Sequence, residues 1–385
     1  MRVFNIGIIG YGGFGKFLHH AWRQIDNVRV VSVADKIVNK IEGLTEVNAY
    51  TDWLDLIQVE NIDVIAIVTE PSTHEIIATT CMKAGIHVLI EKPLAITLAD
   101  AEKIIQIRDQ TGTIAAIDFV MRFNPLLQEL QRFTQLELFG KLRRIDVENY
   151  AQDEQLPPDH WFWNLDHSGG ILIEHAVHFI DLVHFLYPAK LSTVNGLKHN
   201  RNQQQEDQVM ANALYEGGLI ATHYHSFARP GFFETTKIKL AYDLADIELH
   251  GWIPLWGDVT ALVNPQTKKS LMDSTLFEPE HSKPIENISD ESRPRGWGIT
   301  DKPRNLSKHE VHSGGLSYKV DEIISGKFQL GQSKEAVYVK CVQASLLDVL
   351  KKIDNPSHQL TAPLETGLAS LEVAVRATES ARNKP

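Results

Sequence analysis

Short apolar runs alternate with stretches of helical periodicity along the first third of the chain. The apolar runs predict β-strands, and the stretches between them predict helices, among them 72–84 and 94–109. The predicted strands are Phe4–Ile9, Val28–Ala34, Ile62–Val68, Gly85–Ile90 and Ile114–Val120. Strands that alternate with helices form a parallel sheet with both faces covered, so we expect a doubly wound α/β domain at the N-terminus.

The pattern changes after residue 123, where predicted strands follow one another with turns between them. The strands predicted here are 142–150, 211–215, 219–227, 237–241 and 246–250, and the helices are 125–133, 171–186, 336–352 and 364–382. Successive strands indicate a mostly antiparallel, open-faced sheet. We therefore predict an α/β plus α+β protein with domains 1–123 and 124–385.

Residues 264–315 are rich in proline, serine, asparagine and charge. This composition predicts a loop-rich surface insertion within the second domain, and it includes the segment Arg293–Trp297.

Composition narrows the class of protein. A length of 385 residues supports two domains of roughly 150 residues or more. A formal net charge of −11 argues against a nucleic-acid partner, because such proteins carry a basic surface. We see no apolar run near the roughly 18 residues of a membrane span, and the chain passes from Met1 directly into a predicted strand. With only Cys81 and Cys341, both in predicted helices, we expect a soluble cytoplasmic protein without disulfides.

A glycine-rich turn follows the first strand and opens a helix. Gly10, Gly12 and Gly15 have the spacing of the Rossmann dinucleotide fingerprint, and Gly13 and Phe14 lie between them. The first glycine permits the tight turn, the second lets backbone approach a pyrophosphate, and the third lets helix pack on strand. We therefore predict that this turn binds a dinucleotide.

Asp35 ends the second strand, where a carboxylate accepts hydrogen bonds from the adenosine ribose hydroxyls. Its charge would repel a 2′-phosphate and favours NAD, whereas the neighbouring Lys36 could attract one, so NADP stays open. Thr69, Pro71 and His74 follow the strand 62–68, at the sheet edge where such folds bind ligands. We expect them to contact the cofactor.

The triplet Glu91-Lys92-Pro93 follows the strand 85–90. With the glycine turn and Thr69-Glu70-Pro71, it makes the first 125 residues resemble the glucose-fructose oxidoreductase and inositol dehydrogenase family, Gfo/Idh/MocA. The resemblance implies that Lys92 lies beside the nicotinamide and the substrate hydroxyl. Glu91, Lys92 and Arg122 join the expected cofactor contacts. A lysine there can stabilise alkoxide charge while hydride moves.

Glu174, His178 and Asp181 lie at i, i+4 and i+7, which puts them on one face of a predicted helix with Glu174 in reach of the His178 ring. We predict that His178 is the acid-base catalyst and that Glu174 orients it. The resembled family usually has Asp and Gly where this chain has Glu174 and Ala176. The expected substrate contacts are Lys92, Trp163, Glu174 and His178.

Histidines near this helix raise the question of a metal. His175 and His178 are three apart, and the order Glu-His-x-x-His lacks the i, i+4 histidines of zinc proteases, so we predict no catalytic metal. His223 and His225 alternate with Thr222 and Tyr224, and only one of the two pairs can face a cleft. The pattern does not decide which pair, and a solvated face is the alternative.

The leading hypothesis is an NAD(P)-dependent oxidoreductase that acts on a secondary hydroxyl or ketone of a sugar, cyclic polyol or related compound. The alternatives are an NAD-dependent glycoside hydrolase or lyase with transient redox chemistry and a non-catalytic NAD-binding regulator. The resemblance further implies a homodimer or homotetramer that assembles through the second-domain sheet.

Overall fold

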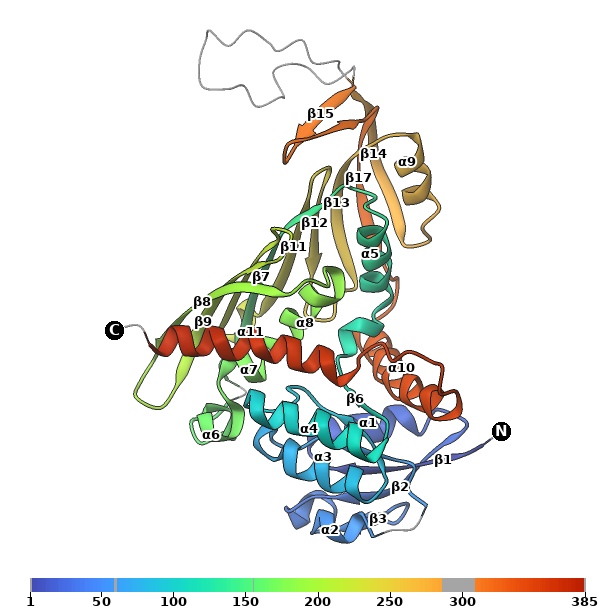
Figure 1. Ribbon diagram of the computed structural model, residues 1–385, viewed down its shortest axis with the longest axis vertical. Coiled ribbons are helices and arrows are strands. Elements are labelled where there is room, and N and C mark those ends of the chain that lie inside the picture. Colours follow the sequence, from blue (N-terminus) through green and yellow to red (C-terminus); the bar gives the residue numbers. More distant parts are fainter. Residues whose placement is uncertain (1, 59–60, 155, 286–308, 384–385) are drawn as a thin grey trace.

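A computed structural model describes residues 2–58, 61–154, 156–285 and 309–383. The protein has two large sheets joined by buried helices and a short hairpin at its far end (Figure 1).

The first sheet has the strand order β3-β2-β1-β4-β5-β6, with every pair parallel. Its strands are β1 (Phe4–Ile9), β2 (Val28–Ala34), β3 (Asn48–Tyr50), β4 (Val64–Ile67), β5 (His87–Ile90) and β6 (Ala115–Ile117). Its helices are α1 (Gly13–Trp22), α2 (Trp53–Leu56), α3 (His74–Lys83) and α4 (Leu98–Thr111). The order reverses between β1 and β4, and in such folds ligands bind beyond the carboxyl ends of the strands at this point. The predicted doubly wound fold is confirmed.

The second sheet has nine strands in the order β14-β17-β13-β12-β11-β7-β10-β9-β8. Its strands are β7 (Leu142–Gln152), β8 (Leu191–Asn200), β9 (Glu206–Tyr215), β10 (Ile220–Arg229), β11 (Thr235–Tyr242), β12 (Ala245–His250), β13 (Trp256–Val263), β14 (Phe277–Pro284) and β17 (Glu322–Gln329). Only β7 and β10 pair in parallel, so the predicted mostly antiparallel sheet is confirmed.

The prediction of a loop-rich insertion at 264–315 is wrong for part of this segment. It contains α9 (Pro265–Met272), β14 and β15 (Glu310–Ser313), which pairs with β16 (Leu316–Lys319). In β14 only Phe277 is buried, so the rest of this edge strand is exposed and its sequence resembles a loop. Arg293–Trp297 lies outside the described residues.

Helices cover one face of the nine-stranded sheet and leave the other open (Figure 1). Besides α9, the described helices of this domain are α5 (Pro125–Gln135), α6 (Leu165–Ser168), α7 (Ile171–Glu174), α8 (Val177–Leu186), α10 (Lys334–Asp354) and α11 (Leu364–Arg382). Along β10, His223 and His225 are fully buried on the covered face, while Thr222 and Tyr224 are half-exposed on the open one. The histidines therefore do not lie on a solvated face.

The segment Leu165–Leu186 is long and apolar enough to span a membrane by length and composition, contrary to the expectation that the chain holds no such stretch. In the structure it is divided into α6, α7 and α8, and most of it is buried within the fold. Apolar helices that are buried in the core of a folded domain meet the same criterion of length and composition.

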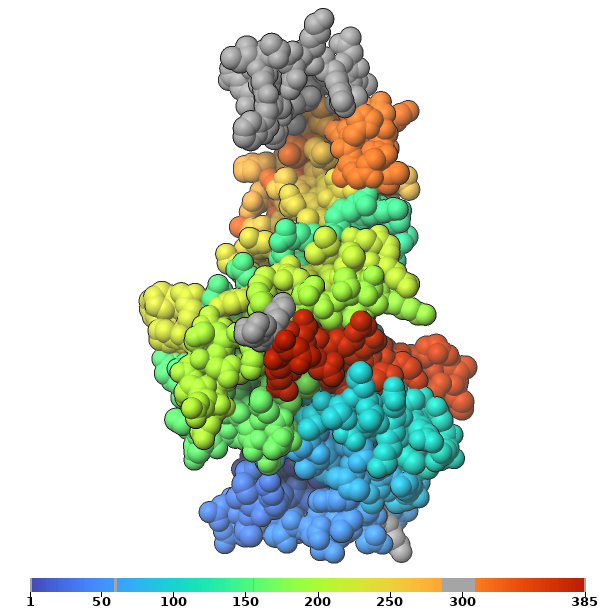
Figure 2. Space-filling view, turned by 60° about the vertical axis from the view of Figure 1, so that its left-hand side comes forward, coloured from blue at the N-terminus to red at the C-terminus, as the bar shows by residue number. Residues whose placement is uncertain are grey.

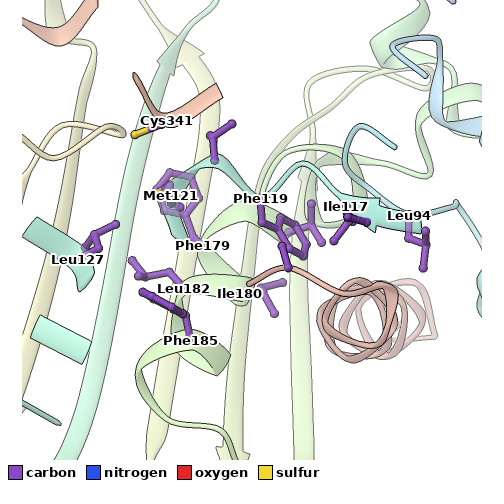
Figure 3. Packing of buried hydrophobic residues seen from close by; sticks show 14 of the residues in the cluster. Leu94, Ile117, Phe119, Met121, Leu127, Phe179, Ile180, Leu182, Phe185 and Cys341 are labelled. Atoms are coloured by element: carbon purple, nitrogen blue, oxygen red, sulfur yellow. The ribbon is translucent and has the colours of Figure 1, made fainter. Parts of the chain in front are cut away.

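The C-terminal helices join the two domains although they are distant in sequence from the first (Figure 2). Trp22 of α1 donates its indole N–H to the Val342 carbonyl of α10 at 2.9 Å, and Gln343 donates back to the Ala21 carbonyl at 2.8 Å. Apolar side chains of both domains form one continuous core, which Figure 3 shows from Leu94 to Phe185. A fixed junction of this kind positions side chains from both domains around one site.

Candidate active site

A pocket of about 380 Å³ lies beyond the carboxyl ends of β4 and β5, where the two domains meet. Its lining combines first-domain loops with residues of the second domain and of α10. The lining residues are Phe14, Val68, Thr69, Pro71, Glu91, Lys92, Val120, Asn149, Ala151, Trp161, Glu174, His175, His178, Phe179, Glu234, Trp252 and Tyr338.

The glycine turn has the geometry that a dinucleotide requires. Gly10 has φ +95°, and a Cβ there would lie 2.2 Å from the Val68 carbonyl oxygen. A Cβ on Gly15 would lie 2.1 Å from the Gly10 carbonyl oxygen, whereas at Gly13 it would meet nothing within 4 Å. In the part of the chain that is described, no side chain caps the N-terminus of α1 at Gly12. The turn therefore combines tight packing beneath it with open backbone N–H groups above, which fits a pyrophosphate.

Asp35 is buried at the end of β2 and accepts hydrogen bonds from the backbone N–H groups of Tyr11 and Ile37 at 2.9 Å each. Lys40 lies 3.2 Å from the same carboxylate, and sequence reasoning did not single it out. Lys36 is exposed and pairs with Glu70 at 3.3 Å. The structure therefore places Asp35 beside the glycine turn, with Lys36 directed to another carboxylate.

Lys92 crosses from the first domain to the second. Its Nζ donates to Glu174 Oε1 at 2.7 Å and to the Glu174 backbone carbonyl at 3.1 Å. Burial by itself would raise the pKa of Glu174, but the Lys92 ammonium, with smaller contributions from His175 and His160, holds this pKa below its usual value. An ammonium has three N–H donors, so one remains for a ligand oxygen.

The prediction that Glu174 hydrogen-bonds to His178 is wrong. The helix is not continuous, because α7 ends at Glu174 and α8 begins at Val177. At the junction the Ala176 N–H bonds to the Ile171 carbonyl, one residue farther back than in a regular α-helix. This local widening breaks the i, i+4 relation, and Glu174 contacts Lys92 instead.

His178 lines the pocket and is half-buried, and its buried Nδ1 has no partner among the described residues. Burial, the Lys92 charge and His175 together hold the pKa of His178 well below 6.5. The ring is therefore neutral near pH 7 and able to accept a proton.

His175 was noted in the sequence only as a possible metal ligand, yet it also lines the pocket. Its Nε2 lies 2.8 Å from Asn149 Oδ1, and the Asn149 amide donates to Thr236 Oγ1 at 2.8 Å. Because an amide oxygen only accepts, His175 must carry its proton on Nε2. Burial lowers the pKa of His175 to about 4, so this ring is also neutral near pH 7. Among the described residues no cluster of three or more histidine, cysteine or acidic side chains is placed to hold a metal.

Glu91 lines the pocket beneath Lys92, and its carboxylate accepts from the Lys92 backbone N–H at 3.1 Å. Burial and the neighbouring Asp118 raise the pKa of Glu91 well above its ordinary value. The floor of the pocket therefore holds a carboxyl group that favours its neutral form.

Three predicted contacts lie elsewhere in the structure. The ring of His74 is fully buried and bridges the carbonyls of Pro93 and Thr69, so it braces two pocket loops from behind. Arg122 makes a buried two-point ion pair with Asp181 and lies outside the lining of the pocket.

Trp163, the third of these residues, packs on Phe162 and Phe227 outside the pocket, and Trp161 takes the predicted position on the wall. One turn of 3₁₀-helix, Trp161–Trp163, sets which indole faces the pocket, and the sequence carries no period that could reveal this. Glu234, Trp252 and Tyr338 come from distant elements and were also missed.

Comparison with known proteins shows the family of this chain. Residues 4–119 match the family profile described as "Oxidoreductase family, NAD-binding Rossmann fold", and residues 127–241 match the "GFO/IDH/MocA C-terminal domain". The chain belongs to the Gfo/Idh/MocA family. Its first domain is therefore an NAD-binding domain, as the glycine turn predicted.

Similar proteins include scyllo-inositol 2-dehydrogenase (NAD(+)) of Bacillus subtilis (strain 168), which is 26% identical over 50% of this chain and 55% of that protein. Myo-inositol 2-dehydrogenase of Thermotoga maritima is 26% identical over 49% of this chain and 57% of that protein. The chain thus spans about half the length of the curated relatives it matches.

Among solved structures, a levoglucosan dehydrogenase in complex with NADH and L-sorbose has a TM-score of 0.74 at 17% identity, over 99% of this chain and 97% of that one. At this identity the likeness shows the fold, and it extends that fold to nearly the whole chain.

Proposed function

We propose that this protein oxidises a secondary hydroxyl of a sugar, cyclic polyol or related compound, or reduces the corresponding ketone, with NAD as hydride carrier. The observation that carries the proposal is the contact of Lys92 with Glu174 across the domain junction, beside the neutral ring of His178. The named relatives are dehydrogenases acting on such compounds, which favours this function over a transient-redox hydrolase or a regulator.

The chain's own residues divide the work at the substrate oxygen. His178 accepts the hydroxyl proton, because its lowered pKa keeps the ring unprotonated near pH 7 and therefore free to take a proton. Lys92 donates a hydrogen bond to the same oxygen and stabilises it as negative charge develops. Glu174 holds the lysine in place through two contacts, one from its side chain and one from its backbone. NAD, when bound, supplies the hydride acceptor.

We also propose that the backbone over Gly12, Gly13 and Gly15 holds the pyrophosphate, with Phe14, Thr69, Pro71 and Glu91 lining the nicotinamide end. NAD is the preferred cofactor because Asp35 would repel a 2′-phosphate and Lys36 is engaged by Glu70. Calorimetric titration tests this preference. NADP binding at least tenfold more tightly than NAD, about 1.4 kcal/mol, would show that Lys36 and Lys40 outweigh Asp35.

The decisive experiment for the activity is a panel of sugars and cyclic polyols, scored by absorbance at the reduced nicotinamide band. The expected result is stoichiometric NADH from at least one compound, with loss of the signal in Lys92→Ala. Product release without net NADH would instead indicate a transient-redox hydrolase. Binding of NAD without turnover on any compound would favour a regulator.

We also propose that the protein is cytoplasmic. It forms a homodimer or homotetramer through the open face of the second sheet. Leu214 and Ile220 pair across β9 and β10 and are 37% and 49% exposed on this face, which leaves apolar surface for a second copy. Light scattering on the purified chain tests it, and a monomer at micromolar concentration would contradict it.

A further inference from the structure

Two carboxyl groups lie side by side at the floor of the active-site pocket, and the proposed mechanism gives a chemical role to neither. Ile90 of β5 pairs with Ile117 of β6, and the Asp118 N–H donates to the Ile90 carbonyl at 2.8 Å. Glu91 and Asp118 are therefore the next pair in register, and such neighbours point to the same face of a sheet. Both are buried, Glu91 to 8% exposure and Asp118 to 1%. The sheet thus holds two acidic groups together away from water.

The pair has too few hydrogen-bond donors for two negative charges. The Lys92 backbone N–H donates to Glu91 Oε2 at 3.1 Å. Glu91 Oε1 and both carboxyl oxygens of Asp118 have no partner in regular hydrogen-bond geometry among the described residues. A buried carboxylate without donors is costly, whereas a carboxyl that keeps its proton can donate to one that has lost it. The geometry therefore favours one proton shared by the two groups, which leaves a single negative charge.

The surroundings divide the proton and the charge unequally. Burial and the neighbouring Asp118 raise the pKa of Glu91 well above its ordinary value. Burial also raises the pKa of Asp118, whereas its contacts with Ser345 and Glu91 act to lower it. Glu91 therefore keeps the proton, and Asp118 carries the charge. The remaining polar side chains that face the pair are Lys92, Tyr338 and Cys341.

The charge of the pair is not cancelled by the pocket lining. Lys92 is the only lysine or arginine among the lining residues, and Glu174 holds its ammonium at 2.7 Å. The rings of His175 and His178 are neutral near pH 7, because the pKa of each is lowered. The charges of Lys92 and Glu174 cancel, so the carboxyl pair leaves one net negative charge in the buried part of the pocket.

The strand order puts this charge at the nicotinamide end of the proposed cofactor site. The adenosine ribose is assigned to Asp35 at the end of β2, and the pyrophosphate to the glycine turn after β1. Strands β4 and β5 follow on the other side of β1, so the second nucleotide lies beyond their carboxyl ends, where Glu91 lines the pocket. The nicotinamide ring is a cation in NAD⁺ and neutral in NADH. A buried negative charge there stabilises only the oxidised form.

We propose that Glu91 and Asp118 act as one group with a shared proton, and that its negative charge makes the site bind NAD⁺ more tightly than NADH. The inference rests on the proposed placement of the cofactor. Glu91 lines the site, whereas Asp118 acts through Glu91 and is a positioning residue. The preference promotes release of NADH and rebinding of NAD⁺ after a substrate has been oxidised.

The test is the ratio of the dissociation constant of NADH to that of NAD⁺, measured by calorimetry without substrate. Glu91→Gln and Asp118→Asn each replace one carboxyl by an amide that can donate to the remaining carboxylate, so the single charge is retained. Each single variant should therefore stay within about threefold of the wild-type ratio. The double variant has no charge and should lower the ratio by about tenfold or more. The exposed pair Asp26→Asn with Glu102→Gln is the matched control and should leave the ratio unchanged.

Two results would overturn the inference. An unchanged ratio in the double variant would show that the pair carries no charge that acts on the nicotinamide. A fall of about tenfold in each single variant would show that both carboxyls are ionised and share no proton. Thermal unfolding checks that each variant folds. Glu91→Met with Asp118→Leu is a second uncharged pair of similar volume, which gives the same measurement if the amide pair is unstable.

The binding ratio is independent of turnover, so it separates this inference from the proposed function. A lowered ratio in the double variant, without NADH from any sugar or polyol, supports the inference and contradicts the oxidoreductase function. Formation of NADH together with an unchanged ratio in the double variant contradicts the inference alone.

Discussion

The two walls of the active-site pocket are built differently. On the first-domain wall the ammonium of Lys92 has a fixed partner, because Glu174 holds it at 2.7 Å. The second-domain wall carries two neutral histidines, His175 and His178, and Nδ1 of His178 lacks a partner among the described residues. One wall therefore supplies preorganised charge, and the other supplies proton acceptors whose state depends on burial. The predictions below test this division.

The largest effect is expected at the neutral wall. His178→Ala should lower kcat/KM by roughly 10²- to 10⁴-fold at pH 7, the range for loss of a general base. The pKa of His178 is lowered, so wild-type activity should persist below pH 6.5 before it falls, and the variant should lose this acid limb. The loss should shrink at high pH, where hydroxide assists. The exposed His281→Ala is the matched control, and equal pH profiles for His178→Ala and wild type would remove His178 from the mechanism.

At the charged wall, Lys92→Ala should lower kcat by on the order of 10²- to 10³-fold, the cost of losing one donor to a developing oxyanion. NAD affinity should change little, because the side chain is proposed to act on the substrate oxygen. The exposed Lys83→Ala on α3 is the control. A large loss of NAD affinity with unchanged kcat would assign Lys92 to cofactor binding instead.

Glu174 tests whether the lysine depends on its partner across the junction. Glu174→Gln keeps a hydrogen-bond acceptor but removes the charge, and should lower kcat about tenfold with a shift of the pH profile. Glu174→Asp retains the charge but shortens the side chain, so it should restore the profile only in part. Glu102→Gln is the exposed control. An unchanged pH profile in Glu174→Gln would mean that its contact with Lys92 is structural only.

The smallest effect per residue concerns acid stability. Buried histidines with lowered pKa, to about 4 in His74, His175 and His184 and to about 3 in His223, bind fewer protons when folded than when unfolded. Their contribution to stability is therefore complete above pH 6.5 and is lost as pH falls from 6.5 toward 4. At pH 5.5 the loss is on the order of 1 kcal/mol per histidine, so Tm should fall between pH 7.5 and 5.5.

Replacing a buried histidine should reduce this dependence, and His223→Gln is the informative variant. Its Tm should fall less between pH 7.5 and 5.5 than that of wild type, whereas His281→Ala should behave as wild type. Equal Tm values at pH 7.5 and pH 5.5 in wild type would contradict the prediction, because they would show that burial does not lower the pKa values of these histidines.

The first domain could be predicted from local pattern to a large extent. Its strands are buried on both faces, so apolar runs mark them, and β1 and β2 begin and end where predicted. Gly10 and Gly15 meet requirements of the backbone, and Asp35 meets a requirement of charge. All three positions lie within one βαβ unit. Lys92 could likewise be named because the triplet Glu91-Lys92-Pro93, directly after a strand, resembles the motif of a known family.

The strands of the second domain, and the contacts that side chains make within the site, depend on the tertiary structure. Strands β8, β13, β14 and β17 were missed because a half-exposed sheet tolerates polar residues on its open face and at its edge. The break between α7 and α8, which turns Glu174 from His178 to Lys92, leaves no mark in the apolar period.

Sequence alone therefore determined the cofactor domain and the identity of Lys92 and His178 as candidates, because those signals depend on neighbouring residues in the chain. Trp161, Glu234, Trp252 and Tyr338 meet at the pocket from segments far apart in sequence. Which of them face it depends on how the two domains pack, and that packing is a property of the whole core rather than of any local period.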